Sequence, residues 1–213
     1  MEGTRLRILQ QLQRNSNDTV DGLSREIGLA PATIRRHLDI LQRDRLVAFK
    51  EVRKKTGRPE YSFYLTEQGQ ETLPKSYDQL LGMMVNELSS LSVDQTSNKD
   101  GQQIVELVFQ RLSEKVWDQH KDQVDANQFD QRVEALMGVL TADEFYPEYE
   151  IVDGQMRLFL MNCPFRSVAL QNTAVCSYDS NVITAMLGTK VEREACISNG
   201  DGCCLYTAQI STS

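Results

Sequence analysis

All five cysteines of this 213-residue chain lie between positions 163 and 204, and the first 162 residues contain none. They are Cys163, Cys176, Cys196, Cys203 and Cys204. Thiolates are soft ligands that bind zinc and iron–sulfur clusters. In a reducing compartment, clustered cysteines are more often metal ligands or redox groups than structural disulfides. The clustering therefore predicts a thiol site, against the alternative that each cysteine is a small buried apolar residue.

The elements around the cysteines predict that some of them converge. We expect Cys163 at the end of a strand, Cys176 in a loop between two helices, and Cys203 and Cys204 at the start of the last strand. Loops and strand ends can bring distant thiols to one metal site. Zinc remains an alternative, although the paired CxxC motifs of structural zinc sites are missing and a Cys₃His site would need His120.

The C-terminal region, residues 102–213, is expected to be a small α/β domain. Helical periodicity covers residues 104–117 and 129–140, and strands at 149–152 and 156–160 flank an Asp-Gly pair of the kind that closes hairpins. Two short helices, at 168–173 and 180–187, precede a second hairpin. That hairpin pairs strands 191–197 and 204–210.

The N-terminal region, residues 1–69, has the element order of a winged helix-turn-helix domain. Helices are expected at 4–14, 19–27 and 31–45, with Gly28 as the stop between the second and third. Strands at 47–54 and 60–65 enclose a basic loop and form the wing. The whole chain is thus expected to be α+β, with a helical middle between the two ends.

The charge of the two ends is opposite. Residues 1–69 hold 13 Lys and Arg against 9 Asp and Glu, a net charge of +4, whereas residues 70–213 carry −11. A basic head on an acidic body indicates that the head binds nucleic acid, because phosphates respond to the local field.

The third helix and the wing supply the candidate DNA-binding residues. A recognition helix places its first residues in the major groove of double-stranded DNA, where arginine and threonine suit base edges or phosphates. The wing tip can meet the phosphate backbone. The candidates are Ala32, Thr33, Arg35, Arg36, Lys54, Lys55 and Arg58.

Residues 70–101 are expected to connect the two ends. Leucines and a tyrosine at helical spacing from Leu73 to Leu91 predict an amphipathic helix over 70–92, with a break near Pro74 as the alternative, followed by a polar linker at 93–101. This helix is a candidate homodimer seam, and packing within the same chain is the alternative.

Several function classes are disfavoured. No apolar run approaches the ~18 residues of a membrane span, and the N-terminus lacks a secretory apolar stretch. We expect a cytoplasmic protein that binds no membrane. Residues 163–213 contain no histidine to act as a base, and the tail has neither a glycine-rich phosphate loop nor a serine elbow. An enzyme with a small-molecule substrate is therefore not expected.

Two phrases carry a family resemblance in the head. They are Ala-Thr-Ile-Arg-Arg-His-Leu, at residues 32–38, and Gly-Arg-Pro-Glu-Tyr-Ser-Phe-Tyr-Leu-Thr, at residues 57–66. With the cysteine-bearing tail, the whole chain resembles winged-helix transcriptional repressors of the iron–sulfur-sensing SufR type, within the DeoR/ArsR-like regulators.

The resemblance implies a dimeric repressor whose affinity for operator DNA is set by an iron–sulfur cluster, usually [4Fe–4S], in the tail. Twelve residues separate two of the family's cysteines, which maps them onto Cys163 and Cys176, and a third maps onto Cys204. The family's other cysteine precedes the Cys-Pro, where this chain has Phe159 and neighbours that cannot ligate. Cys196 or Cys203 is then the candidate fourth ligand. A regulator that binds zinc or senses oxidation through thiols, without a cluster, is the alternative.

Overall fold

The computed structural model describes residues 3–52, 60–123 and 128–210, and the chain divides into two compact units, Met1–Pro74 and Lys75–Ser213. Each unit has its own hydrophobic core. The elements of the first unit are α1 (Thr4–Asn15), β1 (Asp18–Thr19), α2 (Val20–Ile27), α3 (Pro31–Arg43), β2 (Val47–Val52), β3 (Glu60–Leu65) and α4 (Glu67–Glu71).

Local signals fix the pair of helices α2 and α3. The side chain of Thr19 caps α2 by accepting a hydrogen bond of 3.1 Å from the amide of Gly22. Gly28 ends α2 in the left-handed conformation, with φ at 74°, which glycine adopts without strain. Pro31 occupies the first turn of α3, where a missing amide hydrogen costs nothing. The turn between α2 and α3 is thereby set by sequence.

The wing is a small antiparallel sheet with the strand order β1-β3-β2. Strands β2 and β3 pair from Val47 with Leu65 to Val52 with Glu60. The sheet buries Phe63 and Leu65 against the leucines and isoleucines of α1, α2 and α3.

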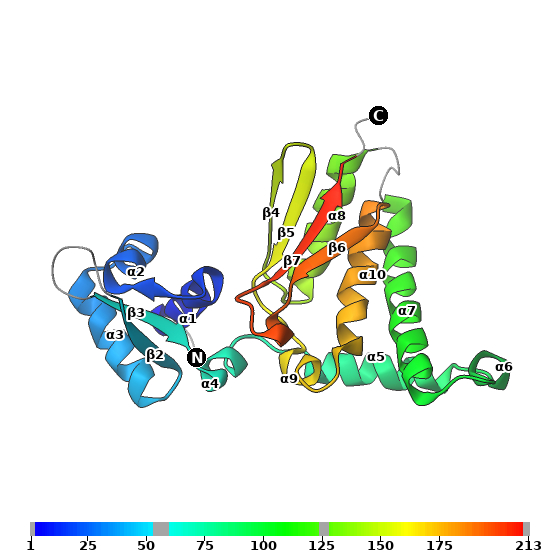
Figure 1. Ribbon diagram of the computed structural model, residues 1–213, viewed down its shortest axis with the longest axis horizontal. Coiled ribbons are helices and arrows are strands. Elements are labelled where there is room, and N and C mark those ends of the chain that lie inside the picture. Colours follow the sequence, from blue (N-terminus) through cyan, green and yellow to red (C-terminus); the bar gives the residue numbers. More distant parts are fainter. Residues whose placement is uncertain (1–2, 53–59, 124–127, 211–213) are drawn as a thin grey trace. The chain divides into compact units, whose positions relative to one another are not determined.

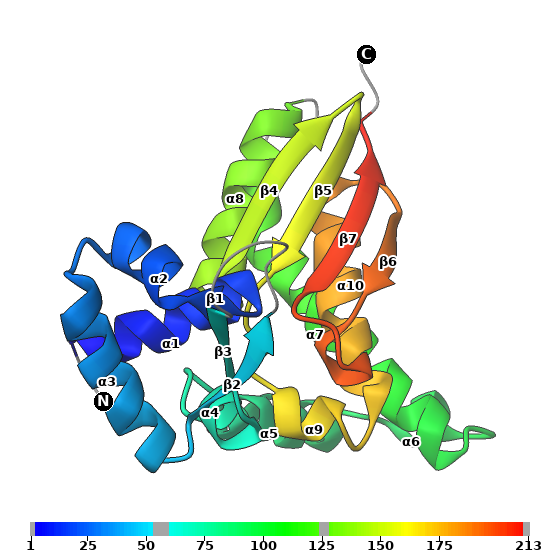
Figure 2. The same cartoon turned by 60° about the vertical axis from the view of Figure 1, so that its left-hand side comes forward.

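The second unit is a four-stranded antiparallel sheet, in the order β4-β5-β7-β6, with helices packed on one face (Figures 1 and 2). Helix α10 packs against both α7 and α8. The elements are α5 (Tyr77–Ser89), α6 (Val93–Thr96), α7 (Gly101–His120), η1 (Lys121–Gln123), α8 (Phe129–Ala142), β4 (Pro147–Val152), β5 (Gln155–Leu160), α9 (Arg166–Ala169), η2 (Thr173–Val175), α10 (Cys176–Leu187), β6 (Val191–Ala195), η3 (Ile197–Asn199) and β7 (Cys204–Gln209).

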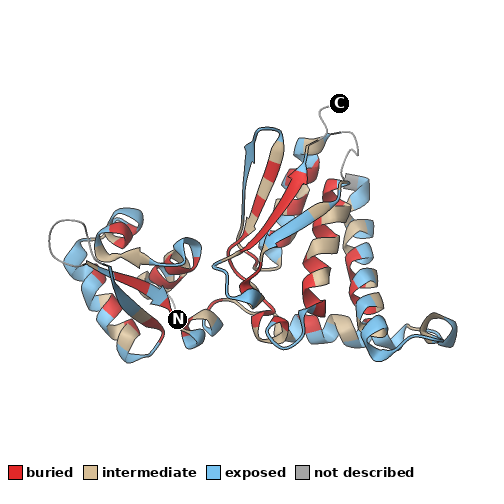
Figure 3. Cartoon of the chain, in the orientation of Figure 1, coloured by how far each residue is buried: buried red, intermediate tan, exposed pale blue. Residues whose placement is uncertain are grey.

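The hairpin expected around Asp153 and Gly154 is present between β4 and β5. Both residues have positive φ, 51° and 75°, as a two-residue turn of the Asp-Gly type requires. The inward faces of β5 and β7 meet α10, and buried residues are concentrated on this helix and on β7 (Figure 3).

Arg132 joins three helices of the second unit. Its Nε donates a 2.7 Å hydrogen bond to the carbonyl of Met186, and its Nη2 donates one of 3.1 Å to Ala185. Its guanidinium also lies over the ring of Trp117, 5.2 Å from the centroid. A cation from α8 therefore satisfies carbonyls at the C-terminal end of α10, where the helix dipole favours positive charge.

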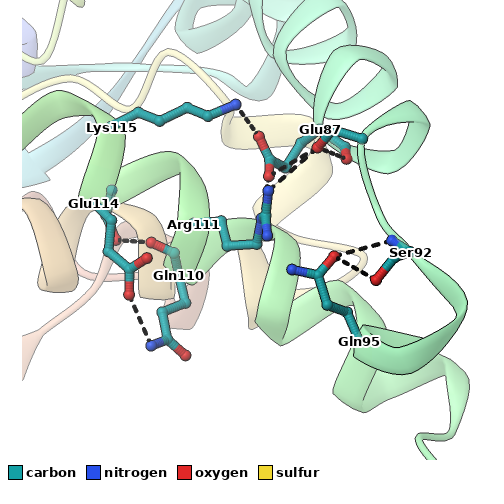
Figure 4. A network of polar contacts seen from close by, with 9 residues as sticks. Glu87, Ser92, Gln95, Gln110, Arg111, Glu114 and Lys115 are labelled. Carbon is teal, nitrogen blue, oxygen red and sulfur yellow. Dashed lines mark hydrogen bonds and ion pairs between the residues drawn. The ribbon is translucent and has the colours of Figure 1, made fainter. Parts of the chain in front are cut away.

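Helix α5 is attached to α7 through a buried carboxylate (Figure 4). The Glu87 side chain is fully buried and forms ion pairs with Arg111 and Lys115 of α7. Burial raises the pKa of Glu87, but hydrogen bonds from Lys115 and Arg111 outweigh it and hold that pKa below its ordinary value. The charge of Glu87 is therefore compensated within the unit.

The helix predicted over residues 70–92 is two helices. Helix α4 ends at Glu71 and α5 begins at Tyr77, because Pro74 lacks an amide hydrogen and disfavours helical geometry at the residue before it. Leu73 packs in the core of the first unit and Leu80 in that of the second. A single seam from Leu73 to Leu91 therefore does not exist.

Candidate functional site

The first candidate surface is the outer side of α3. Ala32, Thr33, Arg35 and Arg36 are exposed, while the leucines and isoleucine between them hold the helix on the core. Among the described residues, neither Arg35 nor Arg36 has a hydrogen bond or ion pair. Their guanidinium groups are thus available to a partner.

Arg35 has different surroundings from Arg36. Arg35 lines a hollow of about 580 Å³ formed by α2, α3 and the wing sheet. Three carboxylates, Asp21, Asp39 and Glu60, line the same hollow, with Phe49, Tyr61 and other residues. Arg36 does not line this hollow. The electrostatic field at Arg35 therefore differs from the field at Arg36.

The wing-tip candidates Lys54, Lys55 and Arg58 lie outside the described residues. The strands that lead to them, β2 and β3, are described up to Val52 and from Glu60. His37 on α3 is half-buried, and its Nδ1 atom is buried without a hydrogen-bond partner among the described residues.

The second candidate site is a cavity lined by four cysteines in the second unit. Cys163 follows β5, Cys176 begins α10, Cys196 follows β6 and Cys204 begins β7. The cavity has a volume of about 10 Å³, close to the space that one water molecule needs. The rest of the lining is Phe145, Phe165, Ala169, Val175, Asp179, Ile197 and Ser198. Four segments separated in sequence thus bring four thiols to one small and mostly apolar space.

Cys196 is the centre of the hydrogen bonds among these thiols. Its Sγ lies 3.8 Å from the Sγ of Cys204 and 3.1 Å from the Oγ of Ser198. The thiol of Cys176 also hydrogen-bonds to it. These donors lower the pKa of Cys196, chiefly the thiol of Cys176 and then that of Cys204, so negative charge in the cavity is favoured on this sulfur.

The other thiols are held in the neutral form. Burial raises the pKa of Cys163 to about 12. The pKa values of Cys176 and Cys204 lie far above the ordinary value. The hydrogen bond to Cys196 is the largest cause, and burial is the second. A metal centre would have to displace these protons in order to bind.

Cys203 is separated from this group. It is half-exposed and does not line the cavity, whereas Cys204, its neighbour, is buried there. Cys203 lies in the bend before β7, whereas Cys204 is the first residue of that strand. The sequence prediction left Cys196 and Cys203 open as fourth members, and the structure places only Cys196 beside Cys163, Cys176 and Cys204.

The backbone around Cys196 is fixed by its own loop. The amide of Cys196 donates a 2.8 Å hydrogen bond to Oδ2 of Asp201, and the amide of Ile197 donates one of 3.4 Å to the sulfur of Cys204. Asp201 therefore stabilises the turn that precedes β7.

Sequence reasoning missed Asp179, which lines the cavity from α10. Asp179 is buried, and burial raises its pKa to about 7. The phenol of Tyr206 donates a hydrogen bond of 2.8 Å to its Oδ2. Its spacing of three residues from Cys176 places the two on one face of a helix, but nothing in the sequence marks Asp179 as buried.

The donor chemistry of the cavity fits a thiolate-bound centre, although the side chains do not form one as they stand. Within residues 3–52, 60–123 and 128–210, no three His, Cys, Asp or Glu side chains are grouped so as to hold a metal ion. The sulfurs are turned toward one another in hydrogen bonds instead. Four soft ligands from four segments nevertheless match the Cys₄ set that iron–sulfur clusters and zinc both accept.

Comparison with known proteins bears on the first unit. Residues 2–48 match the model of a family described as "Bacterial regulatory protein, arsR family". This stretch covers α1, α2, α3 and the start of β2. Together with the exposed basic α3, the match supports a DNA-binding transcriptional regulator with a helix-turn-helix at its N-terminus.

Other comparisons add little. No curated protein matches the chain. Among solved structures, the crystal structure of Bacillus subtilis PadR in complex with operator DNA is similar, at 15% sequence identity and a TM-score of 0.30. That similarity covers 86% of this chain and 95% of that chain. No helix in the described part of the chain is long and apolar enough to cross a membrane.

Proposed function

We propose that the protein is a dimeric transcriptional repressor whose affinity for operator DNA is set by an iron–sulfur cluster, of the [4Fe–4S] type, in the second unit. The ligands are Cys163, Cys176 and Cys204, with Cys196 as the fourth. The observation that carries the proposal is the convergence of these four thiols on one cavity.

The DNA-binding role is assigned to α3 and the wing. Thr33, Arg35 and Arg36 face the major groove beside Ala32, while Lys54, Lys55 and Arg58 meet phosphates. The exposure of the α3 residues and the family match over residues 2–48 support this assignment.

The four thiols of the cavity would hold the proposed cluster. When bound, a cluster supplies an iron–thiolate centre whose presence depends on iron, sulfide and oxidants. The chain's own residues orient the ligands: Asp201 holds the backbone of Cys196, the amide of Ile197 reaches the sulfur of Cys204, and Ser198 reaches that of Cys196. Hydrogen bonds of this kind position thiolates and modulate their basicity.

A second copy of the chain is proposed to pack on α5. Leu81, Val85 and Leu88 are 64%, 51% and 46% exposed and lie at i, i+4 and i+7, so they form one apolar stripe on this helix. Helix-turn-helix proteins read paired half-sites as dimers, which is why the occupant is a second copy. Because α5 packs on α7 and α7 on α10, the helix that begins at Cys176 is coupled to the proposed seam.

Cysteine replacement tests the cluster. Each of the five cysteines is changed singly to serine, and iron, sulfide and the visible spectrum are measured after anaerobic reconstitution. We expect the C163S, C176S and C204S variants to lose their iron and the C196S variant to retain only part of it. The C203S variant is the matched control and should keep its iron. Equal iron in all five variants, or no iron in the unaltered protein, would overturn the cluster proposal.

Zinc is the competing occupant of the same four thiols. A Cys₄ zinc site is colourless and resists dithionite, whereas an iron–sulfur cluster is brown and is bleached by it. A colourless protein with one zinc per chain, lost in the same cysteine variants, would replace the cluster with zinc and leave the DNA-binding assignment in place.

A further inference from the structure

Two of the four cavity cysteines flank the end of a pair of neighbouring strands. The last pair between β6 and β7 is Ala195 with Leu205, after a register shift between Arg193 and Ala195, and Cys196 and Cys204 are the next residues in sequence beyond that pair. Their sulfurs are 3.8 Å apart. A disulfide bond is about 2.05 Å long and spans Cα separations of roughly 4.4–6.8 Å, a range that includes directly opposed residues of antiparallel strands.

The other cysteines are less suited to this pairing. Cys203 does not line the cavity, and Cys163 follows β5, which is separated from β6 by β7. Cys176 begins α10, which packs on α7 and α8, so bringing its sulfur to Cys196 would move part of a helix. Among the cavity cysteines, Cys204 is the one next to the β6–β7 ladder that ends beside Cys196, so this pair is the one favoured to close by a shift of side chains.

We propose that Cys196 and Cys204 form a reversible disulfide in the cluster-free protein when a peroxide oxidises them. The inference concerns the same cavity and so rests on the proposed function for its role, but its chemistry needs no iron. While all four thiols ligate a cluster, neither sulfur of the pair is free to react.

The reaction has two steps that balance. One sulfur of the pair, as its thiolate, attacks one oxygen of hydrogen peroxide, so that an S–O bond forms, the O–O bond breaks, and the hydroxide that leaves takes up the proton released by that thiol and becomes water. The second sulfur of the pair then attacks the sulfur of the sulfenic acid, the S–S bond forms, the S–O bond breaks, and a second water leaves with the proton of the second thiol. Two electrons pass from the sulfurs to the peroxide.

The disulfide would change what the cavity can bind. Two of its four thiols are consumed, so the site cannot take a cluster until a thiol reductant opens the bond. Oxidation thereby converts a cluster-free repressor into a form that does not respond to restored iron and sulfide.

Peptide mapping can test the pairing. The cluster-free protein is treated with hydrogen peroxide and cut with endoproteinase Asp-N. The enzyme cleaves before Asp201, between Cys196 and Cys204. We expect two peptides joined by one disulfide. Their joint mass should be lower by two hydrogen atoms than the sum of the two reduced peptides, and dithiothreitol should separate them. The C203S variant serves as the main sample, because Cys203 and Cys204 fall on the same peptide.

Three further measurements keep the result decisive. Free-thiol titration of C203S should fall from four thiols to two and return to four with dithiothreitol, and iron uptake should fall and recover with it. The C196S and C204S variants should show no linkage, while C176S should keep it. Linkage of Cys196 to Cys176, a disulfide between chains, or sulfinic acid without linkage would overturn the inference.

The test separates this inference from the proposed function. Iron uptake by the reduced protein without any 196–204 linkage after peroxide would refute the disulfide and leave the cluster proposal standing. A 196–204 disulfide in a protein that never takes up iron would refute the cluster proposal and leave the disulfide standing.

Discussion

The hydroxyl of Tyr206, on β7, donates a 2.8 Å hydrogen bond to the buried carboxylate of Asp179, on α10. The bond joins the last strand to the helix that begins with Cys176, directly beside the cysteine cavity. Burial raises the pKa of Asp179 to about 7, and the bond from Tyr206 opposes that rise. A polar pair of this kind is costly to break because it leaves a buried acceptor without its donor.

The variant Tyr206→Phe should lower the free energy of unfolding by about 1–3 kcal/mol, because Asp179 loses its donor in a buried setting. Urea denaturation of the metal-free protein measures the change. Tyr149→Phe is the matched control, since Tyr149 is half-exposed on β4 and should shift stability by less than about 0.5 kcal/mol. Equal effects of the two variants would show that the Tyr206–Asp179 bond does not stabilise the fold.

The variant Arg36→Ala should weaken operator binding by about 1–3 kcal/mol if Arg36 reads a base. Arg35→Ala should cost less, because Asp21, Asp39 and Glu60 line the same hollow and repel a phosphate that approaches Arg35. Fluorescence anisotropy on operator DNA compares both with Lys99→Ala, which removes a charge from the second unit. A greater loss from Arg35→Ala than from Arg36→Ala would contradict the argument from the hollow.

Replacing the wing-tip Lys55 by alanine should weaken binding to all duplexes alike. A phosphate contact carries no sequence information, so its removal should reduce the slope of log K against log salt by about one and leave specificity unchanged. Titrations of specific and random duplexes at several salt concentrations measure both quantities. A loss confined to the operator would assign Lys55 to a base instead.

The stability of the second unit should depend on pH through Glu87. Its folded-state pKa lies below the ordinary value, so its ion pairs stabilise the fold above the unfolded pKa, near 4.5, and this contribution is lost as the pH falls through the folded pKa. Glu87→Gln should lower the free energy of unfolding by roughly 2 kcal/mol at pH 7. This is less than the ~3–5 kcal/mol lost when a fully buried ion pair is broken, because Arg111 and Lys115 are partly exposed.

Urea denaturation of both proteins between pH 7 and pH 3 tests this dependence on pH. The difference between the unaltered protein and Glu87→Gln should shrink steadily below about pH 4.5. Glu114→Gln on α7 is the control, since Glu114 is exposed and its carboxylate accepts a hydrogen bond from Gln110. A difference that is constant with pH would mean that the Glu87 charge is not what stabilises the contact.

Disrupting the apolar stripe on α5 should produce monomers. A charge at Val85 or Leu81 would be buried and unpaired in a dimer, so Val85→Asp and Leu81→Asp should raise the dimer dissociation constant at least 100-fold, by about 2.7 kcal/mol or more. Sedimentation velocity at micromolar concentration measures this. Val93→Asp is the control, because Val93 is 79% exposed and lies on α6. Dimers that persist in both α5 variants would place the seam elsewhere.

The elements of the first unit could be read from the sequence because their signals are local. Thr19, Gly28 and Pro31 each act within a few residues, and the Asp153-Gly154 turn of the second unit is equally local. The prediction over 70–92 allowed a break near Pro74, and the break is present, but Leu73 and Leu80 keep helical spacing across it. Periodicity alone could not show that the two leucines enter different cores.

The cysteine site was only partly predictable. Cys163, Cys176 and Cys204 were named from spacing and resemblance, but the choice between Cys196 and Cys203 depends on where β7 begins, which alternation in sequence does not fix to one residue. Asp179 could not be found, because its partner Tyr206 is 27 residues away and the contact exists only after β7 packs on α10.

Helix α10 is held at one end and begins at the cysteine cavity at the other. Arg132 binds the carbonyls of Ala185 and Met186, while Cys176 is the first residue, about 15 Å away along the axis at ~1.5 Å per residue. A rod fixed at one end tilts when the other end is pushed. A displacement of Cys176 would therefore swing α10 about a pivot at Arg132, with the largest excursion beside the first turn and almost none at Gly188. Spin labels placed along α10 would report a gradient of movement from one end to the other.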